Sequence, residues 1–243
     1  MLSMAAIPSA QNASEYYFKA ENYYTAEKSA AQKAEWHGKG GVRLGLEGQV
    51  TQPVFAAILK GQLPNGIALG RTVGDEWKHF SGVDMTFSAP KSLSLLAYIG
   101  GDSRLLEANR DAVKSTLNWV EENMIMTRIK AQGETRHVKT GSLVAALFPH
   151  DMSRTNDPQA HIHAIVMNVT ERPDGKWASV HNPPLWRDSM LVGRIYRNFL
   201  NINVQELGYQ TRLTHRDGRF EIKGVKALPK IGACGQHILA LVR

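Results

Sequence analysis

Residues 142–169, SLVAALFPHDMSRTNDPQAHIHAIVMNV, contain two strand-like segments joined by a polar connection. The segments run from Ser142 to Phe148 and from Ile162 to Val169, and both have the length and apolar content of β-strands. The connection between them leaves no room for the helical crossover that parallel strands need. We therefore predict an antiparallel pair and an α+β fold, in which helices pack on an antiparallel sheet.

The remaining elements follow from periodicity and from turn residues. Residues 35–48 are rich in glycine and are predicted to be mostly loop. An apolar stripe at helical spacing predicts one long helix over residues 103–130. Further strands are expected at residues 2–7 and 82–88, further helices from residue 12 and at 51–61 and 187–207, and a hairpin at 209–214 and 219–222.

Three histidines in the opening stretch are placed to meet at one point. His161 and His163 are two residues apart on a strand and project to the same face. His150 ends the preceding strand, so pairing of the two strands puts it beside them. Three imidazoles on one side of an ion leave its other side open, which is typical of a catalytic metal site. The alternative is a set of ordinary surface or hydrogen-bonded histidines.

Asp84 lies on the polar face of the predicted strand at residues 82–88, together with Thr86 and Ser88. A carboxylate there can orient a ligand imidazole through the second ring nitrogen. The alternative is a strand residue exposed to solvent.

Four of the seven tyrosines lie within nine residues, as Tyr16-Tyr17 and Tyr23-Tyr24. On a helix, positions seven apart share a face, so the two pairs would stack. An aromatic stripe packed on the core is the simpler interpretation of the spacing alone, but polar neighbours such as Glu15 argue against a fully buried helix.

The tyrosines and the histidines together supply the parts of one reaction. A phenol has an ordinary pKa of about 10, so it needs a base, or a metal on the electrophile, to attack phosphorus. Attack on a phosphodiester would release a 3′-hydroxyl and form a phosphotyrosine ester. Because this ester conserves the bond, the step is reversible, and a second tyrosine permits a second transfer.

The overall composition favours a polyanionic partner. The chain has 29 Lys+Arg against 22 Asp+Glu, a net charge of +7 and a pI near 9.5. A merely basic surface is the alternative. A single cysteine, Cys234, excludes an intramolecular disulfide and a cysteine-rich zinc site. The sequence shows neither a bilayer-length apolar run nor a secretory signal, so we expect a cytoplasmic protein without membrane insertion.

From Met1 to about Gly224 the chain resembles the conjugative relaxases of the TraI/TrwC (MobF) type, members of the HUH endonuclease superfamily. The resemblance is carried, in order, by Tyr16-Tyr17 and Tyr23-Tyr24, Trp36–Gly40 with Leu44–Leu46, Asp84–Ser92, Thr140–Val144, His150–Arg154 and Asp157–His163.

The resemblance implies a fold and a set of roles. The sheet would be Rep-like or ferredoxin-like, with the metal site on its central strands. The implied roles are Tyr16 as first nucleophile, Tyr23 or Tyr24 for the second transfer, Tyr17 as an adjoining member, His150, His161 and His163 as metal ligands, and Asp84 as the residue that orients a ligand or takes the tyrosine proton.

The resemblance also implies partners and a cofactor. The substrate would be a plasmid origin of transfer (oriT), bound as a hairpin plus single strand. Relaxosome accessory proteins and a type IV secretion coupling protein would be further partners, and the DNA-linked protein would pass to the recipient cell. One divalent ion is expected. Phosphoryl chemistry favours Mg²⁺ or Mn²⁺, and imidazole affinity favours Zn²⁺, Ni²⁺ or Cu²⁺.

The sequence departs from the family pattern at two places. Ala160 and Ile162 stand where the family usually has Leu and Thr. Residues 225–243 do not resemble the family, which continues with further helices and commonly a helicase. We therefore expect a catalytic domain over residues 1–224 and a divergent or truncated tail over 225–243.

Several residues near these motifs are candidates for DNA contact. Lys39, Arg43, Lys91 and Arg154 are expected to meet phosphates, and Trp36 to stack on an unpaired base. Ordinary solvated cations and a core tryptophan are the alternatives.

Three other functions remain open from the sequence. A rolling-circle replication initiator uses the same site, but usually places its tyrosine after the histidines. A non-catalytic single-stranded DNA-binding repressor needs no nucleophile. A metallohydrolase with a three-histidine zinc site leaves the tyrosines and the basic charge unexplained.

Overall fold

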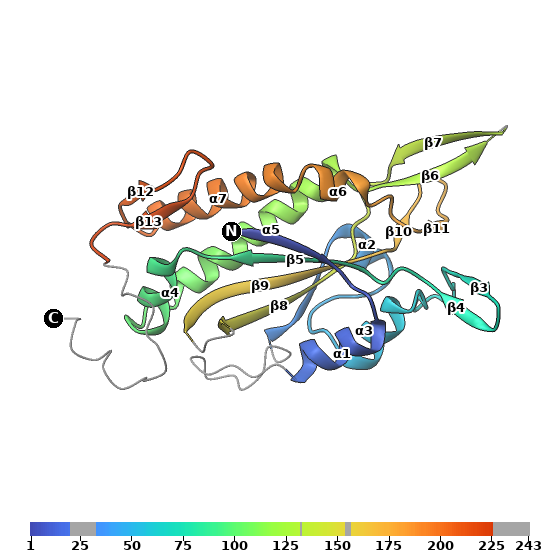
Figure 1. The fold of residues 1–243 in the computed structure, drawn as a ribbon, viewed down its shortest axis with the longest axis horizontal. Coiled ribbons are helices and arrows are strands. Elements are labelled where there is room, and N and C mark those ends of the chain that lie inside the picture. Colours follow the sequence, from blue (N-terminus) through green and yellow to red (C-terminus); the bar gives the residue numbers. More distant parts are fainter. Residues whose placement is uncertain (20–32, 132, 154–156, 226–243) are drawn as a thin grey trace.

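A five-stranded, fully antiparallel sheet runs through the middle of the molecule (Figure 1). The computed structural model describes residues 1–19, 33–131, 133–153 and 157–225. In spatial order the strands are β1 (Leu2–Ala6), β5 (Gly82–Ser88), β9 (Pro158–Met167), β8 (Ala145–Met152) and β2 (Glu35–His37). The predicted α+β class and the antiparallel pairing of β8 with β9 are confirmed.

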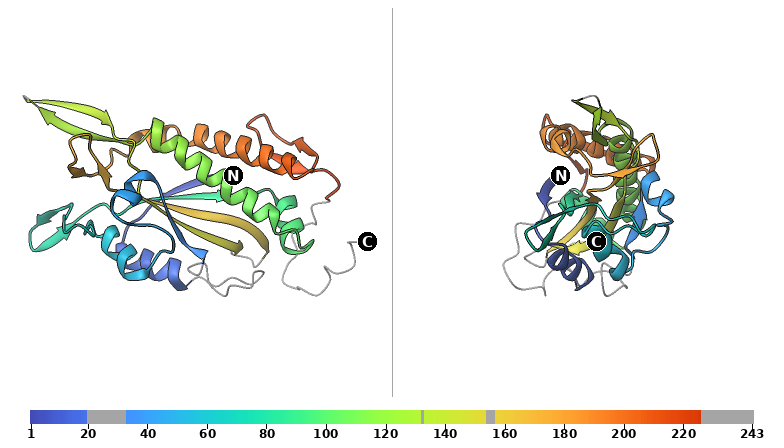
Figure 2. Two further views of the ribbon diagram at one scale, coloured as in Figure 1. Left: turned by 180° about the vertical axis from the view of Figure 1, so that it is seen from behind. Right: turned by 90° about the vertical axis from the view of Figure 1, so that its right-hand side faces the viewer.

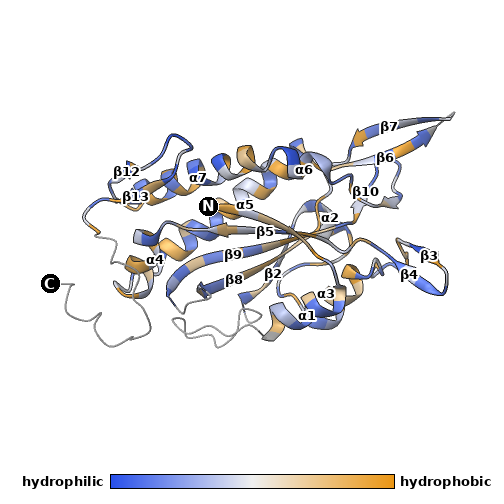
Figure 3. Cartoon of the chain, viewed as in Figure 1, coloured by the Kyte–Doolittle hydropathy of each residue, from blue (hydrophilic) through white to orange (hydrophobic). Residues whose placement is uncertain are grey.

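Helices cover both faces of this sheet (Figure 1, Figure 2). The larger apolar core lies between one face and α4 (Lys91–Tyr98), α5 (Arg104–Asn123) and α7 (Ser189–Glu206). A smaller core lies between the other face and the helices α1 (Ala10–Lys19) and α3 (Gln52–Leu59), and it includes Leu44 and Leu46, which follow the short α2 (Lys39–Arg43). Figure 3 shows that α5 and α7 carry both hydrophobic and hydrophilic residues, as helices with one buried face do.

Strand alternation assigns side chains to the two cores. In β5, Val83, Met85 and Phe87 belong to the larger core. In β9, Ile165 and Met167 belong to the smaller one. Successive strand residues point to opposite faces, so the histidines at 161 and 163 lie on the face of the smaller core.

The strands β8 and β9 extend further into the connection between them than predicted. His150 pairs with His161, and Met152 pairs with Pro158, across a β-bulge between 150 and 152. Backbone pairing therefore continues into the polar connection, which was predicted to lie outside the two strands. All three histidines consequently lie within strands, and none lies in a loop.

The glycine-rich segment at residues 35–48 was predicted to be mostly loop. This prediction is wrong, because the segment forms β2 and α2. Gly38 has φ +102°, and a Cβ there would lie 2.3 Å from the Leu143 carbonyl oxygen. The buried Glu121 carboxylate accepts the N–H groups of Lys39 at 2.8 Å and Leu143 at 2.7 Å. Glycine at position 38 therefore permits close approach of its backbone to that of Leu143, and the Glu121 carboxylate links the two segments by hydrogen bonds.

The helix predicted over residues 103–130 ends at Asn123. Residues Met126–Ala131 form β6 instead, which pairs with β7 (Glu134–Lys139) over six positions. The hairpin made by these strands projects from the body of the molecule (Figure 1), as does a second one that was not predicted, formed by β3 (Arg71–Val73) and β4 (Glu76–Lys78).

The remaining elements agree with the predictions to within a few residues. The short helix at 51–61 is α3, and the helix at 187–207 is α7, which follows the short α6 (Pro183–Arg187). The predicted C-terminal hairpin is β12 (Thr211–Leu213) paired with β13 (Phe220–Ile222). A further small hairpin joins β10 (Thr170–Glu171) to β11 (Trp177–Ala178). Within the described ranges, no helix is long and apolar enough to cross a membrane.

Candidate active site

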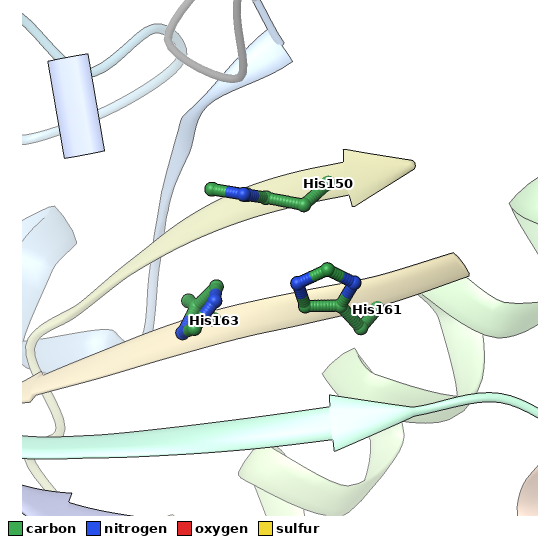
Figure 4. Close-up of side chains that lie close together, drawn as sticks. All are labelled: His150, His161 and His163. Atoms are coloured by element: carbon green, nitrogen blue, oxygen red, sulfur yellow. The ribbon is translucent and has the colours of Figure 1, made fainter. Parts of the chain in front are cut away.

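His150, His161 and His163 converge at one point above two adjacent strands (Figure 4). One ligand nitrogen from each ring lies within 4.8 Å of the others. The ring centroids are 4.8 Å apart for His150 and His163, and 5.2 Å apart for each of the other two pairs. The predicted proximity of the three rings is confirmed, and its cause is the register that pairs His150 with His161.

The second ring nitrogens of two histidines are held by acceptors. His161 Nδ1–H donates to the Gln159 carbonyl oxygen at 2.9 Å, and His163 Nδ1–H donates to Asp84 Oδ2 at 2.8 Å. A carbonyl can only accept, and a carboxylate in this network accepts from several donors, so both protons are placed on Nδ1. The Nε2 lone pairs of these rings are therefore free to bind a cation.

His150 is buried, and its Nε2 has no hydrogen-bond partner in the described part of the chain. Burial, with the neighbouring His163 and His161, lowers the pKa of His150 to about 3. Burial also lowers the pKa of His161 below its usual value. Neutral imidazoles are the form that binds metal ions, and a buried nitrogen without a partner is explained if an ion fills the point of convergence. The residues present therefore fit a three-histidine metal site.

Tyr16 lies over the histidines on the exposed side of the site. Its side chain is 57% exposed, and its ring stacks on that of His150 with a centroid distance of 6.5 Å and an interplanar angle of 22°. The ring centroid of His163 is 6.3 Å away. Helix α1 places Tyr16 here because its neighbour Phe18 packs against Phe55 and Phe148 on the sheet side.

Tyr17 occupies a different environment from Tyr16. It is 5% exposed, and its hydroxyl donates to Asp84 Oδ2 at 2.8 Å. Burial and the Asp84 carboxylate raise the pKa of Tyr17 well above its ordinary value. The sequence placed both tyrosines together as catalytic candidates, and the structure separates them. Tyr16 faces the open side of the site and Tyr17 faces the interior. Tyr23 and Tyr24 lie outside the described residues.

Asp84 is buried, not exposed to solvent as the alternative interpretation held. Its carboxylate accepts hydrogen bonds from His163, from Tyr17 and, at 3.1 Å, from Thr86 Oγ1. The position agrees with the expected orienting role. The sequence identified the face that Asp84 shares with Thr86, but the part played by Tyr17 depends on a contact across 67 residues of chain, which no local pattern signals.

The predicted DNA-contacting cations lie in varied settings. Lys91 donates from Nζ to the Pro158 carbonyl oxygen at 2.9 Å, near the start of the strand that carries two of the histidines. Lys39 pairs with Glu122 at 3.6 Å, and Arg43 pairs with Glu171 at 2.9 Å. Arg154 lies outside the described residues.

Trp36 is only 8% exposed and packs in the smaller core. Little of its ring is therefore available to stack on a base. Core packing, the alternative interpretation of this tryptophan, describes its position in the structure.

A basic cleft of about 560 Å³, which sequence reasoning missed, lies at the opposite end of the sheet. Five basic side chains line it, and its described lining contains no acidic residue; the five are Arg71, Lys78, His79, Arg128 and His181. They come from four separate segments, so only the fold brings them together. The cleft lies between the bases of the two projecting hairpins, β3–β4 and β6–β7.

The chain matches known proteins over most of its length. Residues 10–232 match the family model described as TrwC relaxase. The chain is 38% identical over 234 residues to the multifunctional conjugation protein TraI of Escherichia coli (strain K12), covering 93% of this chain but only 13% of TraI.

Solved structures of TrwC share the fold. A metal-bound structure of conjugative relaxase TrwC in complex with oriT DNA has a TM-score of 0.82 and 37% identity, covering 93% of this chain and 77% of that one. A complex of TrwC with a 27-mer DNA that comprises the recognition hairpin and the cleavage site has a TM-score of 0.81 and 35% identity, covering 93% and 76%. With the family model spanning nearly all of its residues, this chain belongs to the TrwC relaxase family.

Proposed function

We propose that this chain is the catalytic domain of a conjugative relaxase, which nicks one strand of an oriT DNA and later rejoins it. The observation that carries the proposal is the position of the exposed Tyr16 ring directly beside three converging histidines. Membership of the TrwC family, and solved complexes of TrwC with oriT DNA, support the choice of substrate.

In the nicking step, Tyr16 Oη attacks the scissile phosphorus. The Oη–P bond forms as the P–O3′ bond breaks, and the 3′-oxygen leaves and becomes a hydroxyl. The phenol proton can pass to water, because the Tyr16 side chain is more than half exposed. The product is a 5′-phosphotyrosine ester, and attack by a 3′-hydroxyl on that ester reverses the step.

His150, His161 and His163 would hold one divalent ion. When bound, the ion would polarise the phosphate and neutralise charge on its non-bridging oxygens. Three imidazoles favour Zn²⁺, Ni²⁺ or Cu²⁺ on affinity, and phosphoryl chemistry in cells favours Mg²⁺ or Mn²⁺. A copper-bound structure of TrwC in complex with oriT DNA supports the proposal that this chain, too, binds a transition metal.

DNA would bind at both ends of the sheet. Lys91 contacts Pro158 at the start of the strand that carries His161 and His163, where a single strand would pass. The basic cleft between the projecting hairpins would offer the cations Arg71, Lys78 and Arg128 to the phosphates of a duplex stem. The net charge of +7 favours both contacts. Relaxosome accessory proteins and a type IV secretion coupling protein would be further partners, and the reaction on plasmid DNA would take place in the cytoplasm.

Two further roles remain predictions. Tyr23 or Tyr24 would serve the second transfer. Residues 1–224 would form the catalytic domain and residues 225–243 a divergent tail. The chain spans a small part of TraI, so activities of the remaining length of such relatives are not assigned to it.

The experiment is a covalent-adduct assay with single-stranded oriT oligonucleotides. Wild-type protein should give a covalent protein–DNA band on a denaturing gel. EDTA added before the DNA should prevent this band from forming. Tyr16→Phe should bind the oligonucleotide but form no band, whereas Tyr196→Phe, at a buried tyrosine on the other face of the sheet, should behave as wild type. Binding without any adduct would indicate a repressor, and adducts only at a replication origin would indicate an initiator.

A further inference from the structure

We propose that Tyr17 is a positioning residue whose hydroxyl holds the Asp84 carboxylate and, through it, the ring of His163. The proposal rests on the proposed function in treating the three histidines as a metal site. It divides the adjacent tyrosines between two roles, in which Tyr16 reacts and Tyr17 orients.

A continuous hydrogen-bond chain connects Tyr17 to the metal site. Tyr17 Oη donates to Asp84 Oδ2 at 2.8 Å, and His163 Nδ1–H donates to the same oxygen at 2.8 Å. Thr86 Oγ1 donates to the other oxygen, Oδ1, at 3.1 Å. The carboxylate is thus fixed at both oxygens by three protein donors, and its plane is set by contacts from two strands and one helix.

The Tyr17 ring is itself fixed by packing. It stacks on Phe148 with a centroid distance of 5.1 Å and an angle of 26°, and meets Phe55 edge-on at 6.1 Å. The side chain is 5% exposed, against 57% for Tyr16. For Tyr17 to reach a phosphate, it would have to leave this packing and its carboxylate partner. Its geometry therefore suits a fixed donor and not a nucleophile.

Helix geometry explains why the two roles fall to neighbouring residues. Successive helical residues point about 100° apart, so a helix lying along the sheet directs one side chain inward and the next across the open site. The rings of Tyr16 and Tyr17 meet edge-on at 5.0 Å, so the fixed ring also borders the reactive one.

The same contacts assign Asp84 an orienting role. Both carboxylate oxygens accept from donors of the protein, and none of these three hydrogen bonds involves Tyr16. Of the two roles that the family resemblance leaves open for Asp84, the geometry favours orienting His163 over accepting the nucleophile's proton.

The test compares Tyr17→Phe with Tyr196→Phe. Each variant removes one buried tyrosine hydroxyl that donates to a side-chain oxygen, the second to Asn109 Oδ1 at 2.6 Å in the larger core. Both should lose similar thermal stability. Only Tyr17→Phe should weaken Co²⁺ or Ni²⁺ binding, measured by calorimetry, by about tenfold, the lower end of the effect of removing a partner of a ligand histidine.

A double-mutant cycle with Asp84→Asn decides whether Tyr17 acts through Asp84. We expect Tyr17→Phe to have no further effect on metal affinity once Asp84 is replaced. Equal metal affinity in wild type and Tyr17→Phe, or an undiminished effect in the Asp84→Asn background, would overturn the proposal. So would a Tyr17-dependent covalent adduct in Tyr16→Phe.

A metal-free measurement separates this proposal from the proposed function. Imidazole ¹⁵N relaxation in the metal-free protein should show an equally fixed His163 ring in wild type and in Tyr196→Phe, and a more mobile ring in Tyr17→Phe. An unchanged ring mobility in Tyr17→Phe refutes the positioning role. Failure of wild-type protein to bind metal or form an adduct would refute the proposed function alone.

Discussion

Metal-free protein should lose about 2 kcal/mol of stability through His150 alone when the pH falls from about 7 to about 5. Burial, then His163 and His161, lower the pKa of this residue to about 3 in the folded protein, whereas an exposed imidazole titrates near 6.5. Because the folded pKa is lowered, the unfolded chain takes up the proton first. The contribution of His150 to the free energy of unfolding is fully present above about pH 6.5 and is lost progressively as the pH falls toward 3.

The magnitude follows from the width of that window. At about pH 5 the unfolded histidine is about 1.5 pH units below its pKa, and each unit is worth about 1.4 kcal/mol, which gives about 2 kcal/mol. Any folded pKa below about 4 gives nearly the same result, because the folded imidazole is then still neutral at pH 5.

Urea unfolding of EDTA-treated protein near both pH values measures the effect. In His150→Gln the position cannot take up a proton, so its stability should fall by about 2 kcal/mol less than that of wild type. Titration of groups that do not interact with His150 cancels in this difference. His215→Gln, at an exposed histidine, is the matched control and should follow wild type. An equal loss in wild type and His150→Gln would refute the conclusion that the fold holds His150 neutral.

Three further outcomes are expected. Glu121→Ala leaves the N–H groups of Lys39 and Leu143 without their acceptor and should destabilise the protein by about 3 kcal/mol in urea unfolding, whereas Glu121→Gln, which keeps an acceptor oxygen, should lose less. Gly38→Ala should also destabilise the protein in urea unfolding, because its Cβ would lie 2.3 Å from the Leu143 carbonyl oxygen; wild-type stability would contradict the close packing. Affinity for an oriT oligonucleotide should fall about a hundredfold between about 50 and about 200 mM salt if about five phosphates are contacted, and a flat response would exclude a phosphate-dominated interface.

The parts of the site that sequence could predict are those fixed by local geometry. His161 and His163 share a face because strand side chains alternate, and this holds wherever the strand lies. The placement of His150 needed one further assumption, that the two strands pair, and the register bears it out. Asp84 was assigned to the correct face by the same alternation.

The parts that sequence missed depend on what covers each face. Asp84 is buried because α1 lies over it, and Tyr17 contacts it across 67 residues of chain. Glycines at residues 38 and 40 have the same composition signal whether they form a loop or allow tight backbone packing, so a structured segment was predicted to be loop. The strand β6 was predicted as helix because an apolar stripe alone does not show where the backbone begins to pair with a neighbouring strand, here β7.

The register that buries the core is also the register that assembles the histidines. In β9, Ile162 and Ala164 point into the larger core while His161 and His163 point to the opposite face. A shift of one residue would turn the apolar side chains outward and the imidazoles inward, so burial of the core selects against it. The convergence of the rings therefore follows from correct packing of the sheet and does not require an ion to assemble it. This is why a neutral, buried His150 can belong to the folded protein before any metal binds, with the loss of stability at low pH as its measurable consequence.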